Sequence, residues 1–366
     1  MLYYLCHLEN YWGPFRLFRY VTFRSILALI IALVFVLLVG PKIFAWLRKK
    51  NCRDIVRDAS QIRELSAMHA DKKNTTTMGG ICIVGAVVLA VLLCAHYNCY
   101  CVGALLAGLA LASIGVIDDW LKIRYRNSRG LNSCWKWLVQ GLVAWLLLFF
   151  LLQRVESSWE IDKIYVPFLK DPLCCNVPFV LLFLFWFMVL SGTSNAINLT
   201  DGIDGLAVGC SITVVLTYSI FAYVTGHIVL AKYLHLTYLN GVEELTVLCF
   251  AILGACIGFL WYNAHPAEVF MGDTGSLALG AWIGCVALMC QQAFTLVIVG
   301  GVFVVEALSV ILQVASFKMF KRRIFKMSPL HHHFELMQIP ESKIIVRFWI
   351  VSLLCALGGI LTLKLR

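Results

Sequence analysis

Charged residues are scarce in this chain. They make up 14% of its 366 residues, whereas hydrophobic residues make up 61% and the mean hydropathy is +0.85. A soluble globule of this length needs much more polar surface. The scarcity of charge therefore excludes a soluble protein and predicts an integral membrane protein.

Signals for other architectures are also missing. The apolar runs approach or exceed the roughly 20 residues that a helix needs to span hydrocarbon, unlike the short alternating segments of a transmembrane barrel. The chain has no Pro-, Ser- or Gly-rich linker and no segment suited to an independent soluble domain. Residues 1–366 are therefore expected to form one all-α polytopic membrane domain. Its first apolar run is late and long, and a basic loop follows it, so we expect a retained span rather than a cleaved signal.

Cysteine spacing gives no sign of zinc, because the fifteen cysteines include no CxxC pair. Most lie in apolar runs, where free cysteine packs as a small hydrophobe. Cys99, Cys101, Cys174 and Cys175 are expected outside the cytoplasm, where disulfides persist. The sequence leaves their pairing open.

About ten spans are predicted, and their orientation follows from the basic residues. The spans are expected near residues 24–46, 79–97, 101–117, 136–153, 178–197, 206–224, 245–262, 275–291, 294–316 and 344–363. Segments 48–78, 118–136 and 318–347 hold 20 of the 30 Lys and Arg, so they should face the cytoplasm and leave both termini outside. Their contact with anionic lipid explains the net charge of +10, and nucleic-acid binding is not expected.

Three arginines contradict this orientation. Arg16, Arg19 and Arg24 precede or begin the first span on the predicted outer side. Residues 10–20 are rich in Trp, Phe and Arg, and we expect them to form an interfacial helix.

Acidic residues gather at span ends on the predicted cytoplasmic side. Asp118 and Asp119 precede Lys122 by four and three residues, so all three can converge on one face of a helix. An interfacial salt bridge would explain one Asp–Lys pair. Two adjacent carboxylates need a cation or a raised pKa to coexist, and both are features of working sites.

A second cluster contains Asn198, Asp201 and Asp204, spaced by three with Gly202 and Gly205 between them. If the segment is helical, the three polar side chains share one face. Capping of the next helix by Thr200 or Asp201 is the structural alternative. It would need one polar residue rather than three.

A third cluster runs from Asn263 through His265, Pro266 and Phe270 to Gly272-Asp273-Thr-Gly-Ser276. Its end is typical of an anion-binding turn, in which N–H groups at a helix start meet phosphate and an Asp meets a metal. A tight loop without function is the alternative reading of the same composition.

Two further segments supply basic groups. Residues 69–80 place Lys72 and Thr75 before the second span. Near the C-terminus, His331, His332 and His333 follow a basic loop; recognition of a polyanion or sugar is favoured over zinc, because adjacent histidines rarely all reach one metal. Carboxylates for a divalent cation and cations for phosphates together predict metal-assisted phosphoryl transfer.

These motifs resemble the polyprenyl-phosphate N-acetylhexosamine-1-phosphate transferases over nearly the whole chain. The resemblance rests on four motifs: Asp118-Asp119 with Lys122, Asn198-Leu-Thr-Asp201-Gly-Ile-Asp204-Gly-Leu-Ala207, Asn263 to Ser276, and Ser328-Pro-Leu-His331-His332-His333-Phe-Glu335. The last motif is similar to that of the branch whose donor is UDP-MurNAc-pentapeptide. The resemblance implies transfer of phospho-MurNAc-pentapeptide to undecaprenyl phosphate, giving lipid I and UMP, with Mg²⁺ as cofactor. It also implies a homodimer in the bacterial cytoplasmic membrane, with the active-site cleft on the cytoplasmic face.

By the same resemblance, Asp273 is expected to bind magnesium and Asp118 to act as base for the lipid phosphate, with Asp119 and Lys122 as supporting charges. The expected substrate-binding residues are Lys72, Thr75, Asn198, Asp201, Gly202, Asp204, Asn263, Phe270, Gly272, Ser276, His331, His332 and His333. Gly202 and Phe270 are expected near uracil. The chain departs from the family where Asn74 replaces Gly and Thr76 replaces Pro, which affects how Lys72 and Thr75 are presented.

Two alternative functions stay open at this point. A GlcNAc-1-phosphate transferase would differ in its sugar nucleotide. A transporter would place charges along a path through the bilayer, whereas these carboxylates collect at one face.

Overall fold

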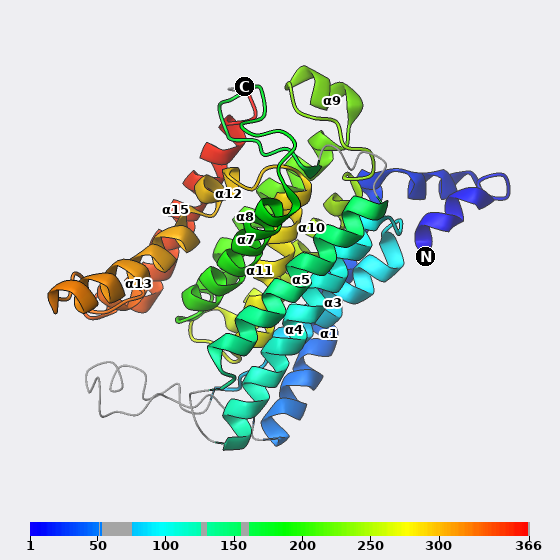
Figure 1. Ribbon diagram of the computed structural model, residues 1–366. Helices are drawn as coiled ribbons and strands as arrows, with labels where there is room; N and C mark the ends of the chain where they lie inside the picture. Colours follow the sequence, from blue (N-terminus) through cyan, green and yellow to red (C-terminus); the bar gives the residue numbers. More distant parts are fainter. Residues whose placement is uncertain (51, 53–74, 126–129, 155–160, 365–366) are drawn as a thin grey trace.

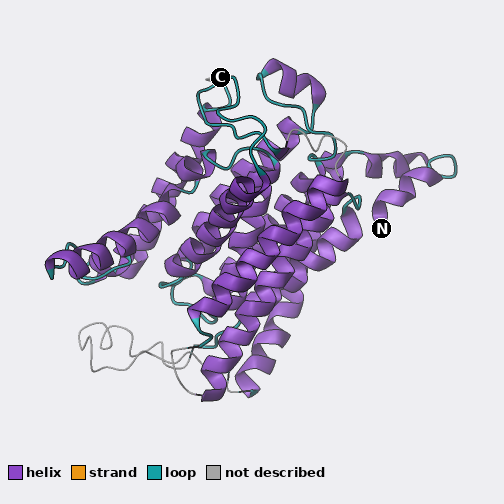
Figure 2. Ribbon diagram, viewed as in Figure 1, coloured by secondary structure: helices purple, strands orange, loops and turns teal. Residues whose placement is uncertain are grey.

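The computed structural model describes residues 1–50, 52, 75–125, 130–154 and 161–364. Within these ranges the regular elements are helices (Figure 2), and β-structure is limited to two isolated bridges. Nine described helices are long and apolar enough to cross a membrane: α1 (Val21–Lys49), α4 (Cys99–Tyr125), α5 (Ser133–Arg154), α7 (Phe179–Thr200), α8 (Leu206–Thr225), α10 (Glu244–Asn263), α11 (Gly272–Met289), α13 (Gly301–Phe320) and α15 (Glu341–Leu361). The all-α membrane fold is confirmed.

Shorter helices complete the described chain. They are η1 (Leu2–Leu8), η2 (Gly13–Arg19), α3 (Gly80–Cys94), α9 (Ile228–Tyr233), α12 (Thr295–Val299) and α14 (Leu330–Glu335). The predicted span 79–97 is only the 15-residue α3. The predicted span 294–316 is interrupted between α12 and α13 at Gly300-Gly301, where the backbone of Gly300 leaves the helical range. Adjacent glycines lower helix propensity enough to allow this break.

Helix α11 forms the centre of the bundle (Figure 1). It packs against α4, α7, α3 and α8, and nearly all of it is buried. Small residues permit this close packing: Gly280 lies against the backbone of Ser194 in α7, and Gly284 lies against Thr193. The N-terminus of α11, which carries Asp273, is thereby fixed among its neighbours.

Arg24 is explained by an ion pair with Glu244. Both residues are almost fully buried, and two guanidinium nitrogens donate to the two carboxylate oxygens at 2.7 and 2.6 Å. The backbone N–H of His96 also donates to Glu244, at 3.0 Å. Because its charge is balanced internally, Arg24 need not oppose the orientation set by the other basic residues.

The predicted interfacial segment 10–20 contains η2 rather than an α-helix. Its position at a membrane surface stays a prediction. All fifteen cysteines are free, so the pairing left open among the four outer cysteines does not occur in this structure.

The two chain ends lie away from the acidic clusters. The terminal ammonium group of Met1 donates to the carbonyls of Leu92 and Leu93, at the end of α3 opposite Gly80. Helix α15 begins at Glu341, beside Asp204, and its 21 residues carry the chain about 30 Å away. Figure 1 also shows α13 diverging from the rest of the bundle.

Candidate active site

Asp118, Asp119 and Asp273 form a compact carboxylate cluster. One oxygen from each lies within 4.8 Å of the others. Asp118 and Asp119 are buried in the last turns of α4, and Asp273 is in the first turn of α11. Asp119 and Asp273 are 154 positions apart in the sequence. They come together because Gly115 of α4 has no side chain, so the backbone of Asp273 can pass close to it.

Two lysines balance this cluster. Lys122 Nζ lies 2.6 Å from Asp118 Oδ2 and 3.1 Å from Asp273 Oδ1, as the helical spacing predicted for Asp118. Lys136, near the start of α5, lies 2.9 Å from Asp118 Oδ1 and 2.8 Å from Asp273 Oδ2. Sequence reasoning missed Lys136, because a single lysine in a basic loop is explained by topology alone.

The Asp119 carboxylate accepts hydrogen bonds at the N-terminus of α11. It accepts from the backbone N–H groups of Asp273 at 3.2 Å and Thr274 at 3.0 Å, and from the Thr274 hydroxyl at 2.7 Å. The predicted anion-binding turn therefore holds the protein's own carboxylate. Gly272 immediately precedes Asp273 and has a φ of +72°, which favours glycine. A Cβ at this position would also lie 2.8 Å from Asp119 Oδ2, so the close contact requires glycine as well.

Asn198 joins this cluster from α7. Its Nδ2 donates to Asp273 Oδ1 at 3.0 Å and to Ser276 Oγ at 2.9 Å. Asp273 thus accepts from two lysines and one amide, which fixes its carboxylate in place. Of the predicted residues, Asn198, Gly272 and Ser276 are therefore assembled around Asp118, Asp119, Lys122 and Asp273.

The common face expected for Asn198, Asp201 and Asp204 does not form. Helix α7 ends at Thr200, with Asp201 as its C-cap, and the chain then turns through Gly205 at φ of +70°. The glycines end the helix, so the spacing of three no longer keeps the side chains aligned. No side chain caps α8, which also excludes the capping explanation for Thr200 and Asp201.

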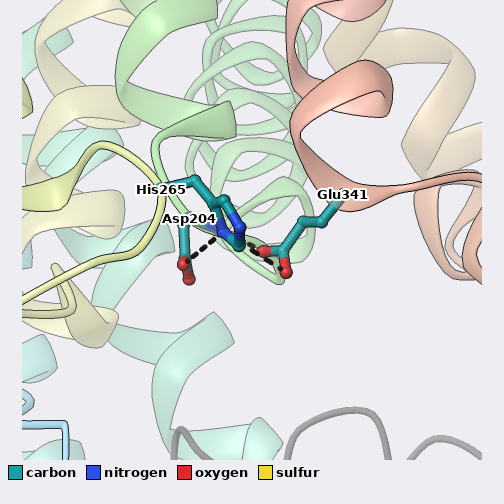
Figure 3. A group of neighbouring side chains, drawn as sticks. All are labelled: Asp204, His265 and Glu341. Atoms are coloured by element: carbon teal, nitrogen blue, oxygen red, sulfur yellow. Dashed lines mark hydrogen bonds and ion pairs between the residues drawn. The ribbon is translucent and has the colours of Figure 1, made fainter.

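Asp204 instead belongs to a second group with His265 and Glu341 (Figure 3). His265 Nδ1 lies 3.0 Å from Asp204 Oδ2 and 3.6 Å from Glu341 Oε2. Glu341 Oε1 accepts from the Asp204 N–H at 3.1 Å, and Asp204 Oδ2 accepts from the Ala267 N–H at 3.1 Å. This network fastens the start of α15 to the loops that follow α7 and α10.

The segment before α3 lies beside Phe270. Phe270 N–H donates to Thr76 at 2.7 Å, and its carbonyl accepts from Gly79 N–H at 2.9 Å. Thr75 is thereby brought next to the loop that leads to Asp273. Lys72, which was predicted to bind substrate, lies outside the described residues.

Asn263 is buried beneath the loops. Its amide donates to the Val269 carbonyl at 2.8 Å and accepts from the Gly205 N–H at 3.1 Å. Asn263 therefore links the loop that follows α7 to the loop that follows α10. Gly202, by contrast, is exposed.

The three histidines have separate partners. His331 Nδ1 lies 3.2 Å from Glu306, His332 Nδ1 lies 2.6 Å from Glu335, and His333 Nδ1 accepts from the Lys326 N–H at 3.1 Å. The His331 and His332 rings are in contact, with centroids 4.2 Å apart, although their Nδ1 atoms face different carboxylates. The preference for a polyanion or sugar over zinc stays a prediction. Glu306 was missed, although an isolated acid in an apolar run is itself a signal of function.

The donor atoms of the carboxylate cluster fit magnesium. They are all oxygens, which this hard cation prefers, and Asp273 is the most accessible of the three side chains, at 13% exposed. The residues present are therefore suited to the ion that the resemblance implies.

Comparison with known proteins defines the class first. Residues 101–291 match Glycosyl transferase family 4, and this range includes both carboxylate helices and the loops between them. Two relatives match over 100% of both chains: the phospho-N-acetylmuramoyl-pentapeptide-transferases of Opitutus terrae, 45% identical, and Methylacidiphilum infernorum, 44% identical. The chain belongs to the phospho-N-acetylmuramoyl-pentapeptide-transferase family.

Proposed function

We propose that the protein transfers phospho-MurNAc-pentapeptide from UDP-MurNAc-pentapeptide to undecaprenyl phosphate, forming lipid I and UMP. The observation that carries this proposal is the cluster of three carboxylates and two lysines at the ends of membrane helices. A water-soluble diphosphate and a membrane-held phosphate could both reach such a position. The full-length relatives carry the name of this activity, which supports the choice of sugar nucleotide.

The lysines have the clearest electrostatic task. Lys122 and Lys136 each bridge Asp118 and Asp273, so they are held where the phosphates of both substrates would meet. Fixed cations of this kind stabilise the charge on a transferring phosphoryl group. Magnesium, held by Asp273, would neutralise the diphosphate when bound.

Direct attack is the step that the contacts favour. An oxygen of undecaprenyl phosphate attacks the β-phosphorus, the bond from that phosphorus to the bridging oxygen breaks, and UMP leaves with the bond's electrons. Asp273 is a poor nucleophile because a lysine faces each of its oxygens. Asp118 likewise holds a lysine at each oxygen, so we assign it a charge-positioning role; its role as base stays a prediction. The attacking phosphate is anionic near neutral pH and needs little help from a base.

The orientation and assembly also belong to this proposal. The site would face the cytoplasm, where the nucleotide donor is available, because the basic segments collect on that side. We further propose a homodimer in the bacterial cytoplasmic membrane.

The test is UMP release by purified protein in detergent, with undecaprenyl phosphate and either UDP-MurNAc-pentapeptide or UDP-GlcNAc. Release with the first donor alone, abolished by EDTA and restored by Mg²⁺, is expected. Release with UDP-GlcNAc alone would assign the protein to the other sugar donor. A radiolabelled sugar-phosphate adduct on the protein without lipid would contradict direct attack.

A further inference from the structure

Glu306 is a buried acid in an otherwise lipid-exposed helix. Its exposure is 0%, whereas most of α13 is accessible and only Val302, Phe303 and Ser309 are buried with it. A carboxylate in such a place is costly unless other groups compensate its charge and hydrogen-bonding capacity. The transfer chemistry described above does not use it.

Three N–H groups converge on this carboxylate. The backbone N–H of Leu330 donates to Oε2 at 2.7 Å, that of His331 donates to Oε1 at 3.1 Å, and His331 Nδ1 lies 3.2 Å from Oε2. The two backbone groups are at the start of α14, where no helical partner exists. Glu306 therefore caps the histidine-bearing helix from a different helix.

The same contact sets the proton of the His331 ring. A carboxylate can only accept hydrogen bonds, so the nitrogen facing it carries the proton and Nε2 of the neutral ring is an acceptor. In the described part of the chain, Nε2 is buried and has no hydrogen-bond partner. It lies against Gly202, whose missing side chain leaves room for it.

We propose that Glu306 is a positioning residue for the transfer reaction: it holds His331 in the Nδ1–H form, with Nε2 directed at the Gly202 loop to accept a hydrogen bond from an O–H or N–H group of the bound sugar nucleotide. This role rests on the proposed function. It assigns Glu306 an effect through His331 rather than on the phosphates.

The test replaces Glu306 with Met, which leaves Nδ1 without the carboxylate acceptor that holds the ring in the Nδ1–H form. Carboxylates that orient a functional histidine typically cost about 10–100-fold when replaced, and we expect such a fall in kcat/KM. In a His331→Asn background, Glu306→Met should cause little further loss, because both changes act through one ring. Glu306→Asp should restore part of the activity. Leu308→Ala, at an exposed position of α13, is the control and should stay near wild type.

The second readout is ¹⁵N NMR of histidine-labelled protein in detergent, with the His331 signal assigned from His331→Asn. The expected form is Nδ1–H in the wild type, with the Nε2–H form appearing in Glu306→Met. An unchanged His331 tautomer, or additive losses in the double variant, would overturn the role of Glu306. The spectrum needs no substrate, so an inactive wild type would count against the proposed transferase function and not against this tautomer assignment.

Discussion

Lys136 gives the sharpest test of the charge arrangement, and we predict that Lys136→Met lowers kcat strongly. Among the described residues, the change leaves Lys122 as the one cation that pairs with Asp118, Asp119 and Asp273. An ammonium group about 4 Å from a carboxylate is worth roughly 4 kcal/mol at the dielectric near a protein surface, much of which desolvation offsets. Loss of one fixed group that stabilises transition-state charge costs about 10²–10³-fold in kcat, or about 2.7–4 kcal/mol, and this is the expected effect.

The assay is UMP release at saturating donor and lipid, with size-exclusion chromatography and thermal unfolding to verify the fold. Lys136→Arg keeps the charge and should retain more activity than Lys136→Met. Lys318→Met removes an exposed lysine at the end of α13 and should leave kcat unchanged. Wild-type kcat in a folded Lys136→Met protein would refute the reasoning that this cation serves the phosphates.

The remaining predictions concern the carboxylates, the glycine loop and the outer ion pair. Asp118→Asn and Asp273→Asn should each abolish UMP release while the protein still elutes as a folded species; near-wild-type rates in either would remove it from the mechanism. Gly202→Ala places a methyl group against His331, and overpacking of about 1–3 kcal/mol should raise the donor KM roughly 5- to 150-fold, measured in donor titrations; a wild-type KM would contradict the contact between Gly202 and His331. Arg24→Met leaves the buried carboxylate of Glu244 without its ion-pair partner and should destabilise the protein by about 3–5 kcal/mol. The expected result is a lower Tm with unchanged kcat per folded molecule, and an unaltered Tm would show that the pair contributes little.

Much of the fold could be predicted because the membrane restricts the alternatives. A backbone in hydrocarbon must satisfy its own hydrogen bonds, so long apolar runs become helices. The two differences, short α3 and the break at Gly300, concern local helix ends that hydropathy does not resolve. The contacts of α11 could not be read from the chain, because they depend on which small residues face one another.

The carboxylate cluster was partly predictable because helical spacing fixes local geometry. Asp118 and Lys122 are four residues apart, and their contact follows from the turn of the helix. Their approach to Asp273 depends on how α4 packs against α11, about 150 residues later in the sequence. The sequence indicated this contact only by placing both segments on the same predicted face of the membrane. Asp204 shows the limit of the same argument, because the spacing rule fails once the helix ends at Thr200.

Two buried acids that the motifs did not include share a physical property that the sequence did display. Glu306 is a single acid within an apolar run, and Glu244 is the second of two adjacent acids at the start of one; each is fully or almost fully buried with a compensating partner. Because an unpaired charge in hydrocarbon is costly, each such residue implies a partner from elsewhere in the chain. The sequence position of the acid does not reveal the role of its partner. Arg24 lies at the end of the bundle away from the carboxylate cluster, whereas His331 lies against the Gly202 loop. The end of the bundle at which each buried pair lies therefore distinguishes the Arg24–Glu244 pair, to which we give a structural role, from the Glu306–His331 pair, which we propose serves the site.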